Sequence, residues 1–542
     1  KTAYEIRLSL VGSEMCIRDS AKTMLLTILV YSLCTGLSAI SVGFWDFAFY
    51  RFITGLGVGG EFAVGVALVA EVMPTRARQH ALSLLQALSA VGNLTAASLS
   101  VWLGHLESTG VLGSVELWGF KLSAWRLMFV IGTVPALLAI VIRGRLREPE
   151  QWQKSVLAEQ AKDGKVMVAG SYRELFGDPR WRHGAIVGLA LATSGVIGVW
   201  GIAFFSFDLV RSVFRKTADQ EARAAGHVDL DVMLISLAMS DPSVLNQESI
   251  GGKPISSIVT PTSMISTAPG LRDTDLVWSA ILEARKQRAG GDSGSVEVAL
   301  DLGDLEQAVS KANAAAYAKN REAIEALVAK ATSVDLATFP LLEERFATSY
   351  LDDGRIPPGM ESKSAAQRLA NWIAIRSGRI NGDLTKWTGY AGMLLNVGAF
   401  FGMYGFGAVS SRIGRRPAFL IAFLIAAASA ILLFSMLQTK NDVLWMFPLM
   451  GVCVLAPFAG YAIYFPELFP TRLRSTGTSF CYNVGRYLAA TGPLTLGYLT
   501  GTIFVAKEEP LRWAGVAMCS VYLIGIAALP FAQETKDQPL PE

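Results

Sequence analysis

The sequence predicts an all-α protein that crosses a membrane many times and consists of two parallel six-helix repeats. Three observations predict this fold class: the composition, a series of long apolar runs, and a loop motif that occurs twice. Of the 542 residues, 52% are hydrophobic and 17% are charged, whereas soluble domains carry about 25% charged residues. Since 48 Lys and Arg stand against 45 Asp and Glu, no large basic surface is expected to bind a nucleic acid.

The apolar runs are long enough to be membrane-spanning helices. A helix needs about 20 mostly apolar residues to cross a bilayer, and barrel strands would be shorter and would alternate strictly. Ten runs fit the helical pattern: 21–42, 47–72, 79–104, 125–143, 184–207, 387–409, 417–438, 443–465, 478–503 and 511–531.

The basic residues between the runs predict the orientation of the helices. Positive charge favours the cytoplasmic side of a membrane, and Lys and Arg gather in alternate connections, such as 73–78, 410–416 and 470–474. We therefore expect these loops and the C-terminus to be cytoplasmic. By parity, the long polar connection at 210–385 is outside.

The repeated motif predicts the length of the repeat. Residues 71–78 and 467–474 share the pattern Glu-x-x-Pro-Thr-Arg-x-Arg, and six runs separate the two copies. A six-helix unit with both copies on one side implies two parallel repeats. Because two runs rather than four precede the first copy, we expect helices 1 and 2 of the fold to be missing, with helices 3 to 12 present. Residues 1–19 resemble translated sequencing adapter and are excluded from the fold.

These patterns predict the following organisation. Residues 210–385 form a mainly helical insert, with helical periodicity at 273–288 and 305–331, and a spacer, a partner-binding cap and a substrate-gathering lid are all compatible with it. The predicted parts are an artefact at 1–20, the remainder of the N-terminal bundle (helices 3–6) at 21–143, a cytoplasmic linker at 144–183, helix 7 at 184–209, the insert at 210–385, helices 8–12 at 386–531 and a cytoplasmic tail at 532–542.

The motifs resemble those of the major facilitator superfamily. They are Arg51-x-x-x-Gly55-x-Gly57-x-Gly59-Gly60-Glu61, the two repeated loops, the loop 407–416, Arg147-Glu148-Pro149-Glu150-x-Trp152 and Glu534-Thr535-Lys536. The resemblance implies a secondary transporter that works by alternating access. Residues 148–152 and 534–536 look like sugar porter signatures, but the seventh helix lacks that branch's paired glutamines. The run 480–486 is similar to organic acid and sialate proton symporters, which favours an organic anion and proton coupling.

Arg486 is the first candidate for binding the solute. It lies inside the ninth run with Asn483 one turn earlier, and a charge inside a span is costly enough to indicate function. Its guanidinium can hold a carboxylate through two hydrogen bonds, or it can be the structural partner of an acidic residue on another helix. Further substrate-binding candidates are the polar and aromatic residues Gln86, Asn93, Trp200 and Asn396.

Two acidic residues are candidates for proton coupling. Glu61 lies deep in the second run, where burial raises a carboxyl pKa toward neutrality, although it is equally suited to an ion pair. Asp208 ends the fifth run and is suited either to the outer vestibule or to the membrane interface. In the resembling family a coupling acid often lies on the first helix, which this sequence does not contain.

Two further residue sets are expected to serve the fold and its motion. Gly55 and Gly59 lie four residues apart, a spacing that lets helices approach closely, and we assign Arg51, Gly55, Gly57, Gly59 and Gly60 to helix packing. The family resemblance implies a cytoplasmic charge network that holds one of two conformations. Its expected members are Glu71, Arg76, Arg412, Arg415, Arg416, Glu467, Arg472 and Arg474.

The function hypotheses follow from these features. The first is a transporter that moves a small solute with a proton across a bacterial inner membrane. Alternatives are a transporter-like receptor whose outer insert binds a protein partner, and a sugar transporter of the same fold. We find no catalytic, metal-binding or cofactor-binding pattern in the sequence, so an enzyme is not expected.

Overall fold

The computed structural model describes most of the predicted helices and part of the insert. Described are residues 20–108, 116–117, 120–121, 123–134, 172–224, 230, 233, 237, 249–250, 253–254, 339–351, 353–507 and 509–541. The predictions for residues 1–19, for the segment 144–171 and for insert helices at 273–288 and 305–331 lie outside these residues. Two compact units make up the chain: unit 1 (Lys1–Asp208, Thr388–Gly497 and Ala514–Glu542) and unit 2 (Leu209–Trp387 and Tyr498–Trp513).

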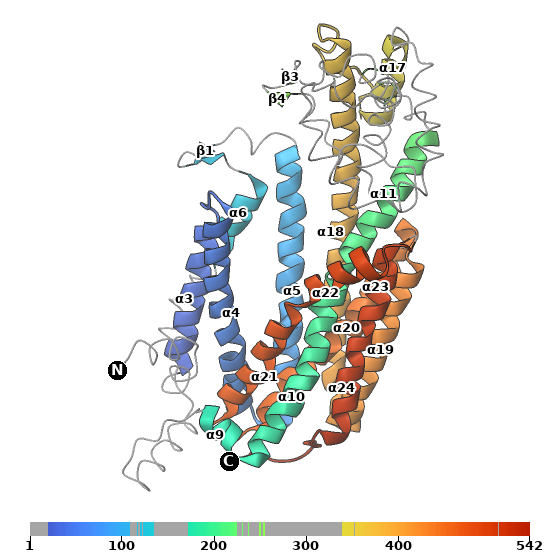
Figure 1. Ribbon diagram of the computed structural model, residues 1–542. Coiled ribbons are helices and arrows are strands. Elements are labelled where there is room, and N and C mark those ends of the chain that lie inside the picture. The colour runs from blue at the N-terminus through green and yellow to red at the C-terminus, as the bar shows by residue number, and fades with distance from the viewer. Residues whose placement is uncertain are drawn as a thin grey trace, which may run out of the picture. The chain divides into compact units, whose positions relative to one another are not determined.

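Unit 1 begins with the helices that we call the first helix group: α3 (Ser20–Ser38), α4 (Phe44–Val72), α5 (Thr75–Ser108) and α6 (Ala124–Ile131). Helices α3 and α4 pack side by side (Figure 1). A Cβ atom at Gly57 would lie 2.9 Å from Cβ of Tyr31, so this contact requires a glycine. The resulting close backbone approach is typical of helices packed in a membrane.

Polar side chains form hydrogen bonds with backbone groups at the ends of these helices. The carboxylate of Asp46 accepts hydrogen bonds from the backbone N–H of Val42, at 2.6 Å, and of Gly43, at 2.9 Å. The hydrogen bond from Val42 is the main cause that lowers the pKa of Asp46. Arg126 in α6 donates to the carbonyl oxygens of Ala39 and Ser41 after α3. A short antiparallel hairpin, β1 (Glu116–Leu117) with β2 (Phe120–Lys121), precedes α6.

The second helix group of unit 1 starts with α9 (Tyr172–Gly177) and α10 (Pro179–Ile197). Asp178 begins α10 by accepting the N–H of Arg180 at 2.8 Å, as expected of an N-cap residue. Helix α10 continues into a π-helical segment, η1 (Gly198–Ala203), and into α11 (Ser206–Ala224).

The middle of the second helix group is also closely packed. This part of the group contains α18 (Ala365–Ile413) from Thr388 onward, α19 (Arg415–Met436) and α20 (Lys440–Leu468). Cβ atoms at Gly398 and Gly402 would lie 2.0 Å and 2.1 Å from the carbonyl oxygens of Pro448 and Val452. Small residues therefore allow α18 and α20 to touch through their backbones.

The predicted span at 478–503 is divided rather than continuous. Helix α21 (Arg474–Ala489) ends, and α22 (Gly492–Tyr498) starts a new helix that passes into π-helical η4 (Leu499–Ile503). The break coincides with Pro493, which has no backbone N–H to continue the helical ladder. The remaining elements are α23 (Pro510–Met518), η5 (Cys519–Val521), α24 (Tyr522–Ala528) and η6 (Leu529–Phe531).

Six helices in the described part of the chain are long and apolar enough to cross a membrane. They are Ala77–Leu103, Pro179–Arg215, Ala365–Ile413, Arg415–Met436, Lys440–Leu468 and Pro510–Phe531. The predicted class of an all-α, multi-pass membrane protein is confirmed, and the runs at 79–104, 184–207, 387–409, 417–438, 443–465 and 511–531 fall in these helices. The arrangement as two six-helix repeats stays a prediction.

Unit 2 contains the described part of the insert. Its elements are most of α11, the hairpin β3 (Ser249–Ile250) with β4 (Lys253–Pro254), α17 (Phe339–Tyr350), the first part of α18 and, from outside the insert, η4 with the start of α23. The buried carboxylate of Glu343 accepts a hydrogen bond from Trp372 Nε1 at 2.9 Å and is paired with Arg368. Phe346 lies beside the Trp372 ring, so α17 and α18 enclose a small aromatic core with a satisfied charge.

Candidate functional site

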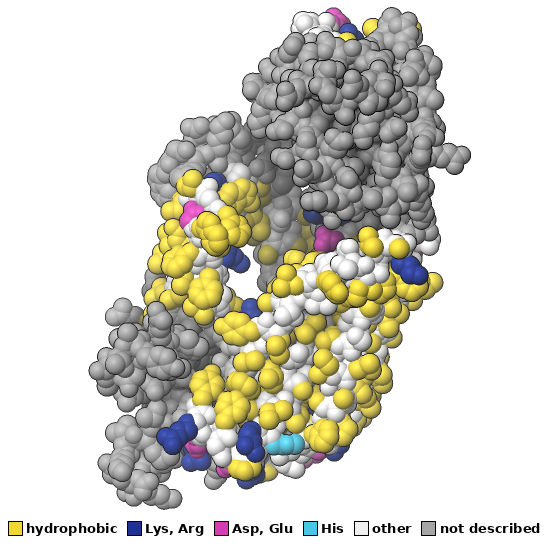
Figure 2. All heavy atoms as spheres, viewed as in Figure 1, with side chains coloured by type: hydrophobic (Ala, Val, Ile, Leu, Met, Phe, Trp, Pro, Cys, Tyr) yellow, Lys and Arg dark blue, Asp and Glu magenta, His cyan; other side chains and the backbone are white. Residues whose placement is uncertain are grey.

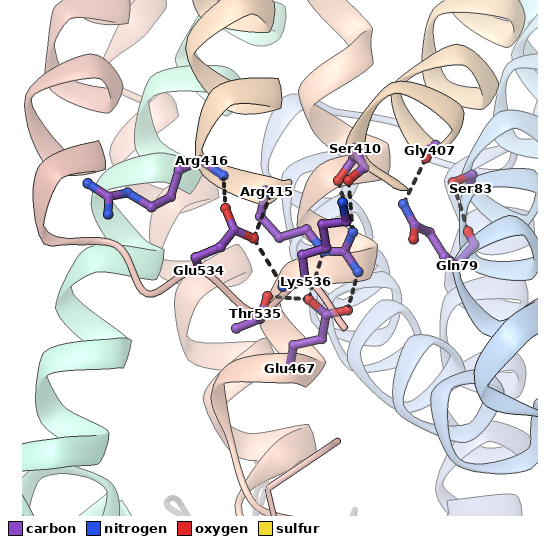
Figure 3. Close-up of polar contacts among 10 residues, drawn as sticks. All are labelled: Gln79, Ser83, Gly407, Ser410, Arg415, Arg416, Glu467, Glu534, Thr535 and Lys536. Atoms are coloured by element: carbon purple, nitrogen blue, oxygen red, sulfur yellow. Dashed lines mark hydrogen bonds and ion pairs between the residues drawn. The ribbon is translucent and has the colours of Figure 1, made fainter. Parts of the chain in front are cut away.

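A clamp of charged residues holds α19, α20 and the C-terminal tail together at the end of unit 1 that carries the repeated loops, which we call the motif end. Arg415 donates from Nε to Glu467 Oε2 at 3.0 Å and from its terminal nitrogen to Oε1 at 2.8 Å (Figure 3). Thr535 also donates to Glu467, and Arg415 reaches Ser410 at 3.2 Å. A paired, planar arrangement of this kind is the strong form of an ion pair.

Glu534 caps the N-terminus of α19 from the far end of the chain. Its carboxylate accepts the backbone N–H groups of Arg415 at 2.9 Å and Arg416 at 3.1 Å, and also that of Lys536 at 3.0 Å (Figure 3). Burial by itself would raise the pKa of Glu534, but these hydrogen bonds outweigh burial and lower it. A negative charge at a helix N-terminus is stabilised by the helix dipole.

Gly414 allows this cap to form. Its φ is +97°, in the region that side chains disfavour. A Cβ atom there would also lie 2.8 Å from Glu534 Oε2. The glycine before α19 is therefore required twice, once for backbone conformation and once for space.

An ion pair joins the two helix groups at the motif end. Glu71 at the end of α4 accepts a hydrogen bond from Arg474 at the start of α21, at 2.9 Å. Arg474 is 2% exposed and donates to the carbonyl oxygens of Pro466 and Pro541 as well. Burial lowers the pKa of Arg474, Glu71 opposes this effect and Arg78 adds to it.

A second contact between the groups joins α5 and α18. Gln79 Nε2 donates to the carbonyl oxygen of Gly407 at 2.7 Å (Figure 3). A Cβ atom at Gly407 would lie 1.9 Å from Ser83 Oγ, so no larger residue fits without separating the helices.

The structure distributes the predicted charge network over several contacts. Arg412 accepts Lys536 Nζ on its carbonyl oxygen at 2.8 Å, and Arg416 donates to the carbonyl oxygen of Leu529 at 3.1 Å. Arg472 pairs with Glu174 at 2.8 Å. The side chain of Arg76 lies outside the described part of the chain. The cap by Glu534 and the hydrogen bond from Thr535 to Glu467 were not predicted, although both residues lie in the motif Glu534-Thr535-Lys536.

Farther along the same helices, α4 and α21 meet through an amide and a pair of rings. Asn483 Nδ2 donates to the backbone carbonyl oxygen of Gly59 at 2.9 Å and to Ser479 Oγ at 3.0 Å. The rings of Phe62 and Tyr482 are stacked with their centroids 4.0 Å apart. Asn483, a predicted binding residue, thus uses its N–H groups to hold the two helix groups together.

Arg486 lies one turn beyond this contact, with its guanidinium carbon 5.8 Å from the centre of the Tyr482 ring. Within the described residues, the guanidinium has no carboxylate at ion-pair distance and no hydrogen-bond partner. A half-buried cation with only an aromatic neighbour is suited to bind an anion that arrives from outside the chain.

Within the described part of the chain, none of the remaining predicted site residues contacts Arg486. Asn396 donates to the carbonyl oxygen of Gly392 in its own helix, at 2.8 Å. Trp200 is 46% exposed and lies beside Phe204. The structure leaves Gln86 half-buried, and it leaves Asn93 and Asp208 exposed. The side chain of Glu61 lies outside the described residues.

The glycines predicted for packing differ from one another. Gly57 contacts α3 and Gly59 contacts Asn483, but a Cβ atom at Gly55 would meet nothing within 4 Å. The packing expected at Gly55 is therefore not seen. Arg51 lies over the Phe129 ring, 5.4 Å from its centre. Nothing is described of the surroundings of Gly60.

Comparison with known proteins places these features in a family. The family model of the Major Facilitator Superfamily matches residues 8–240, and that of the Sugar (and other) transporter family matches residues 393–542. Between them the two models include both helix groups. The chain belongs to the major facilitator superfamily, as its motifs predict, and is an integral, multi-pass membrane protein.

Several similar proteins are named as transporters, and each is matched over part of its length. A putative metabolite transport protein of Haemophilus influenzae is 33% identical over 177 residues, which are 32% of this chain and 39% of that protein. The cis,cis-muconate transport protein of Acinetobacter baylyi is 28% identical over 35% of this chain and 42% of its own length. The sialic acid transporter NanX of Escherichia coli is 33% identical over 24% of this chain and 28% of its own length.

The chain therefore matches less than half of the length of each of these relatives: 39%, 42% and 28%. Among solved structures, a bacterial homologue of the human lysosomal transporter Spinster, in an inward-facing conformation, aligns with a TM-score of 0.37 at 13% identity. That alignment covers 94% of this chain and 82% of the other chain.

Proposed function

We propose that this protein is a secondary transporter that moves a small organic carboxylate across the membrane by alternating access, coupled to protons. The observation that carries the proposal is Arg486, a cation inside a helix predicted to span the membrane, which lies on an aromatic ring and has no acidic partner in the described part of the chain. An arginine in a low-dielectric site binds a carboxylate strongly because both hydrogen bonds are charge-assisted.

The names of several relatives support a carboxylate as the solute. Relatives from Acinetobacter baylyi include transporters of cis,cis-muconate, benzoate and niacin, and each of these solutes is a carboxylate near neutral pH. Sialic acid, the solute named for NanX, is one as well. A glucose transport protein of Synechocystis is also similar, at 37% identity over 25% of this chain, which keeps the sugar alternative open to test.

The contacts at the motif end support alternating access. Two different seams, α4 with α21 and α5 with α18, join the helix groups there. An alternating-access carrier needs two states that differ by a few kcal/mol. We infer that the Glu71–Arg474 pair stabilises the state in which the motif end is closed, and that this end faces the cytoplasm.

Proton coupling rests on the two acidic candidates, Glu61 and Asp208. The expected result is that Glu61→Gln no longer accumulates the carboxylate against its gradient, because the carrier has lost a proton-binding group. Asp208→Asn tests the second candidate in the same way. Accumulation by both variants at the unmodified level would remove these residues from the coupling mechanism.

Uptake by proteoliposomes tests the carboxylate proposal. The purified chain, reconstituted with an imposed pH gradient, is expected to take up labelled benzoate or cis,cis-muconate in preference to glucose. Arg486→Gln should abolish carboxylate uptake, and Arg486→Lys should retain part of it, because the charge remains without the planar fork. Arg180→Gln is the matched control, since Arg180 also lies over an aromatic ring, that of Trp181, in the first turn of α10 and before the predicted apolar run 184–207.

The outcomes separate the alternatives. Glucose uptake that does not depend on Arg486 would favour a sugar transporter. Binding of the carboxylate without net uptake would favour the receptor, and a protein partner for the 210–385 insert would then be sought. Unchanged carboxylate uptake by Arg486→Gln would contradict the assignment of this residue.

A further inference from the structure

The contact between α4 and α21 opens toward a second arginine. Glu71 pairs with Arg474, and Gly59 meets Asn483. From the first pair to the second, the residue number decreases along α4 and increases along α21. The two helices are therefore antiparallel. Beyond Gly59, this register leads to Gly55 and Arg51 on α4, and to Arg486 on α21.

Arg51 lies on the side of α4 that leads to this contact. Arg51, Gly55 and Gly59 follow one another at intervals of four along α4, which places them on one side of the helix. Arg486 follows Asn483 by three residues and lies over Tyr482, the ring that stacks on Phe62 of α4. The register therefore leads from the contact to one arginine of each helix group, with the Arg51 guanidinium over Phe129 of α6.

The seam is filled as far as Gly59 and is open beyond it. A Cβ atom at Gly59 would lie 3.2 Å from Asn483 Oδ1, whereas one at Gly55 would meet nothing within 4 Å. Arg51 is exposed and rests on Phe129. The space-filling view shows a hollow between the α3–α4–α6 helices and α21, with basic side chains on its walls (Figure 2).

Neither cation is neutralised within the described residues. Arg51 contacts the Phe129 ring and Arg486 the Tyr482 ring, and neither has a carboxylate at ion-pair distance in that part of the chain. Two such cations beside one hollow are unfavourable in a membrane unless a ligand supplies negative charge to both.

Resting on the proposed function, we propose that Arg51 forms a second anion subsite and that the preferred solute is a linear dicarboxylate held between Arg51 and Arg486. On α21, Arg486 lies three residues beyond Asn483. On α4, Arg51 lies eight residues beyond Gly59 in the same direction. At 1.5 Å per residue the two positions differ by about 7.5 Å along the seam. With carbon–carbon bonds of about 1.5 Å, a diacid about six carbons long spans a similar distance.

Equilibrium binding to the purified full chain in detergent micelles tests this subsite with adipate and with hexanoate, a monoacid of the same length. Adipate is expected to bind at least about tenfold more tightly, since it makes a second charge-assisted contact. Succinate is too short to reach both arginines and is expected to bind no better than hexanoate.

The variants assign the preference to Arg51. Arg51→Gln should lower the affinity for adipate about tenfold, to about that for hexanoate, and Arg51→Lys should retain part of the preference. Arg486→Gln should weaken both acids, and the control Arg180→Gln neither. Thermal unfolding of each variant confirms that it is folded, so a loss of affinity is not a loss of structure.

Two results overturn the proposal, and they differ from each other. If hexanoate binds through Arg486 and Arg51→Gln leaves the adipate preference unchanged, the subsite is wrong and the carboxylate transporter stands. If neither acid binds and glucose does, the proposed function fails together with the subsite.

Discussion

The two copies of the repeated motif have the same sequence pattern and different partners. Glu467 is held within the second helix group by Arg415, the first residue of α19. Glu71, its counterpart, crosses to the other helix group and pairs with Arg474 of the second copy. The same residue type at the same motif position is thus a local clamp in one copy and a link between groups in the other.

The difference follows from which arginine lies within reach of each glutamate. Arg415, the first residue of α19, lies beside the second copy and pairs with Glu467. Arg474 is held in place by the carbonyl oxygens of Pro466 and Pro541, and its remaining donor points to Glu71. A glutamate in a repeated motif takes the cation that the fold places within reach.

The largest effect is expected from breaking the clamp within one group. Glu467→Gln leaves the guanidinium of Arg415, 7% exposed, without its charged partner. Removing one member of a buried pair costs about 3–5 kcal/mol, so the melting temperature in detergent should fall by several degrees. Arg415→Gln should have a similar effect, and a melting temperature equal to that of the unmodified protein would show that the clamp does not stabilise the fold.

Breaking the link between groups should change conformation more than stability. In a chain whose native cysteines are replaced, Ser83→Cys reports on opening, because Ser83 is buried at the seam of α5 with α18. Glu71→Gln should raise its rate of maleimide labelling about tenfold, which corresponds to a shift of about 1.4 kcal/mol.

A double-mutant cycle sharpens this test. With Arg474→Gln already present, adding Glu71→Gln should have little further effect on labelling, since the pair acts as a unit. Equal and additive effects of the two substitutions would mean that they do not act through their mutual contact.

The cap on α19 should make stability depend on pH at the acidic end. Hydrogen bonds lower the pKa of Glu534 below its usual value of 4.5, so its contribution is complete above that value and is lost as the pH falls through the lowered pKa. The difference in melting temperature between the unmodified protein and Glu534→Gln should be constant above about pH 5 and shrink below pH 4.5. A difference that grows on acidification would exclude the cap as its cause.

The smallest effect is expected at the exposed pair. Arg472 and Glu174 are 2.8 Å apart, with side chains 42% and 25% exposed. Because water screens such a pair, Arg472→Gln should change the unfolding free energy by less than about 1 kcal/mol. It should also leave labelling of Ser83→Cys unchanged, which would distinguish it from Glu71→Gln. A large change in either would show that exposure is a poor guide at the motif end.

Much of the fold was predictable because it depends on local composition. Apolar length sets where a helix can cross a membrane, and six of the predicted runs lie in helices suited to do so. The run 478–503 was predicted as one continuous helix, because hydrophobicity alone does not show the break at Pro493 between α21 and α22. The two-residue hairpins were not predicted, since so short a pattern carries no periodicity.

The candidate site was predictable in its residues but not in its contacts. Arg486 was predicted from a charge inside an apolar run, and Glu71, Glu467 and the arginines of the loops from the repeated motif and the family resemblance. That Asn483 would bind the backbone of Gly59, and that Gly55 would meet no neighbouring atom within 4 Å, required the packing of α4 against α21. These residues are hundreds of positions apart in the chain.

The sequence by itself determined the class of protein, its membrane helices and its charged motifs, because each depends on residues close together in the chain. Tertiary structure alone decided which cation each glutamate binds and that Arg486 has no acidic partner in the described part of the chain. The physical reason is distance: a salt bridge or hydrogen bond acts over a few ångströms. The partners of a motif residue are therefore decided by helix packing.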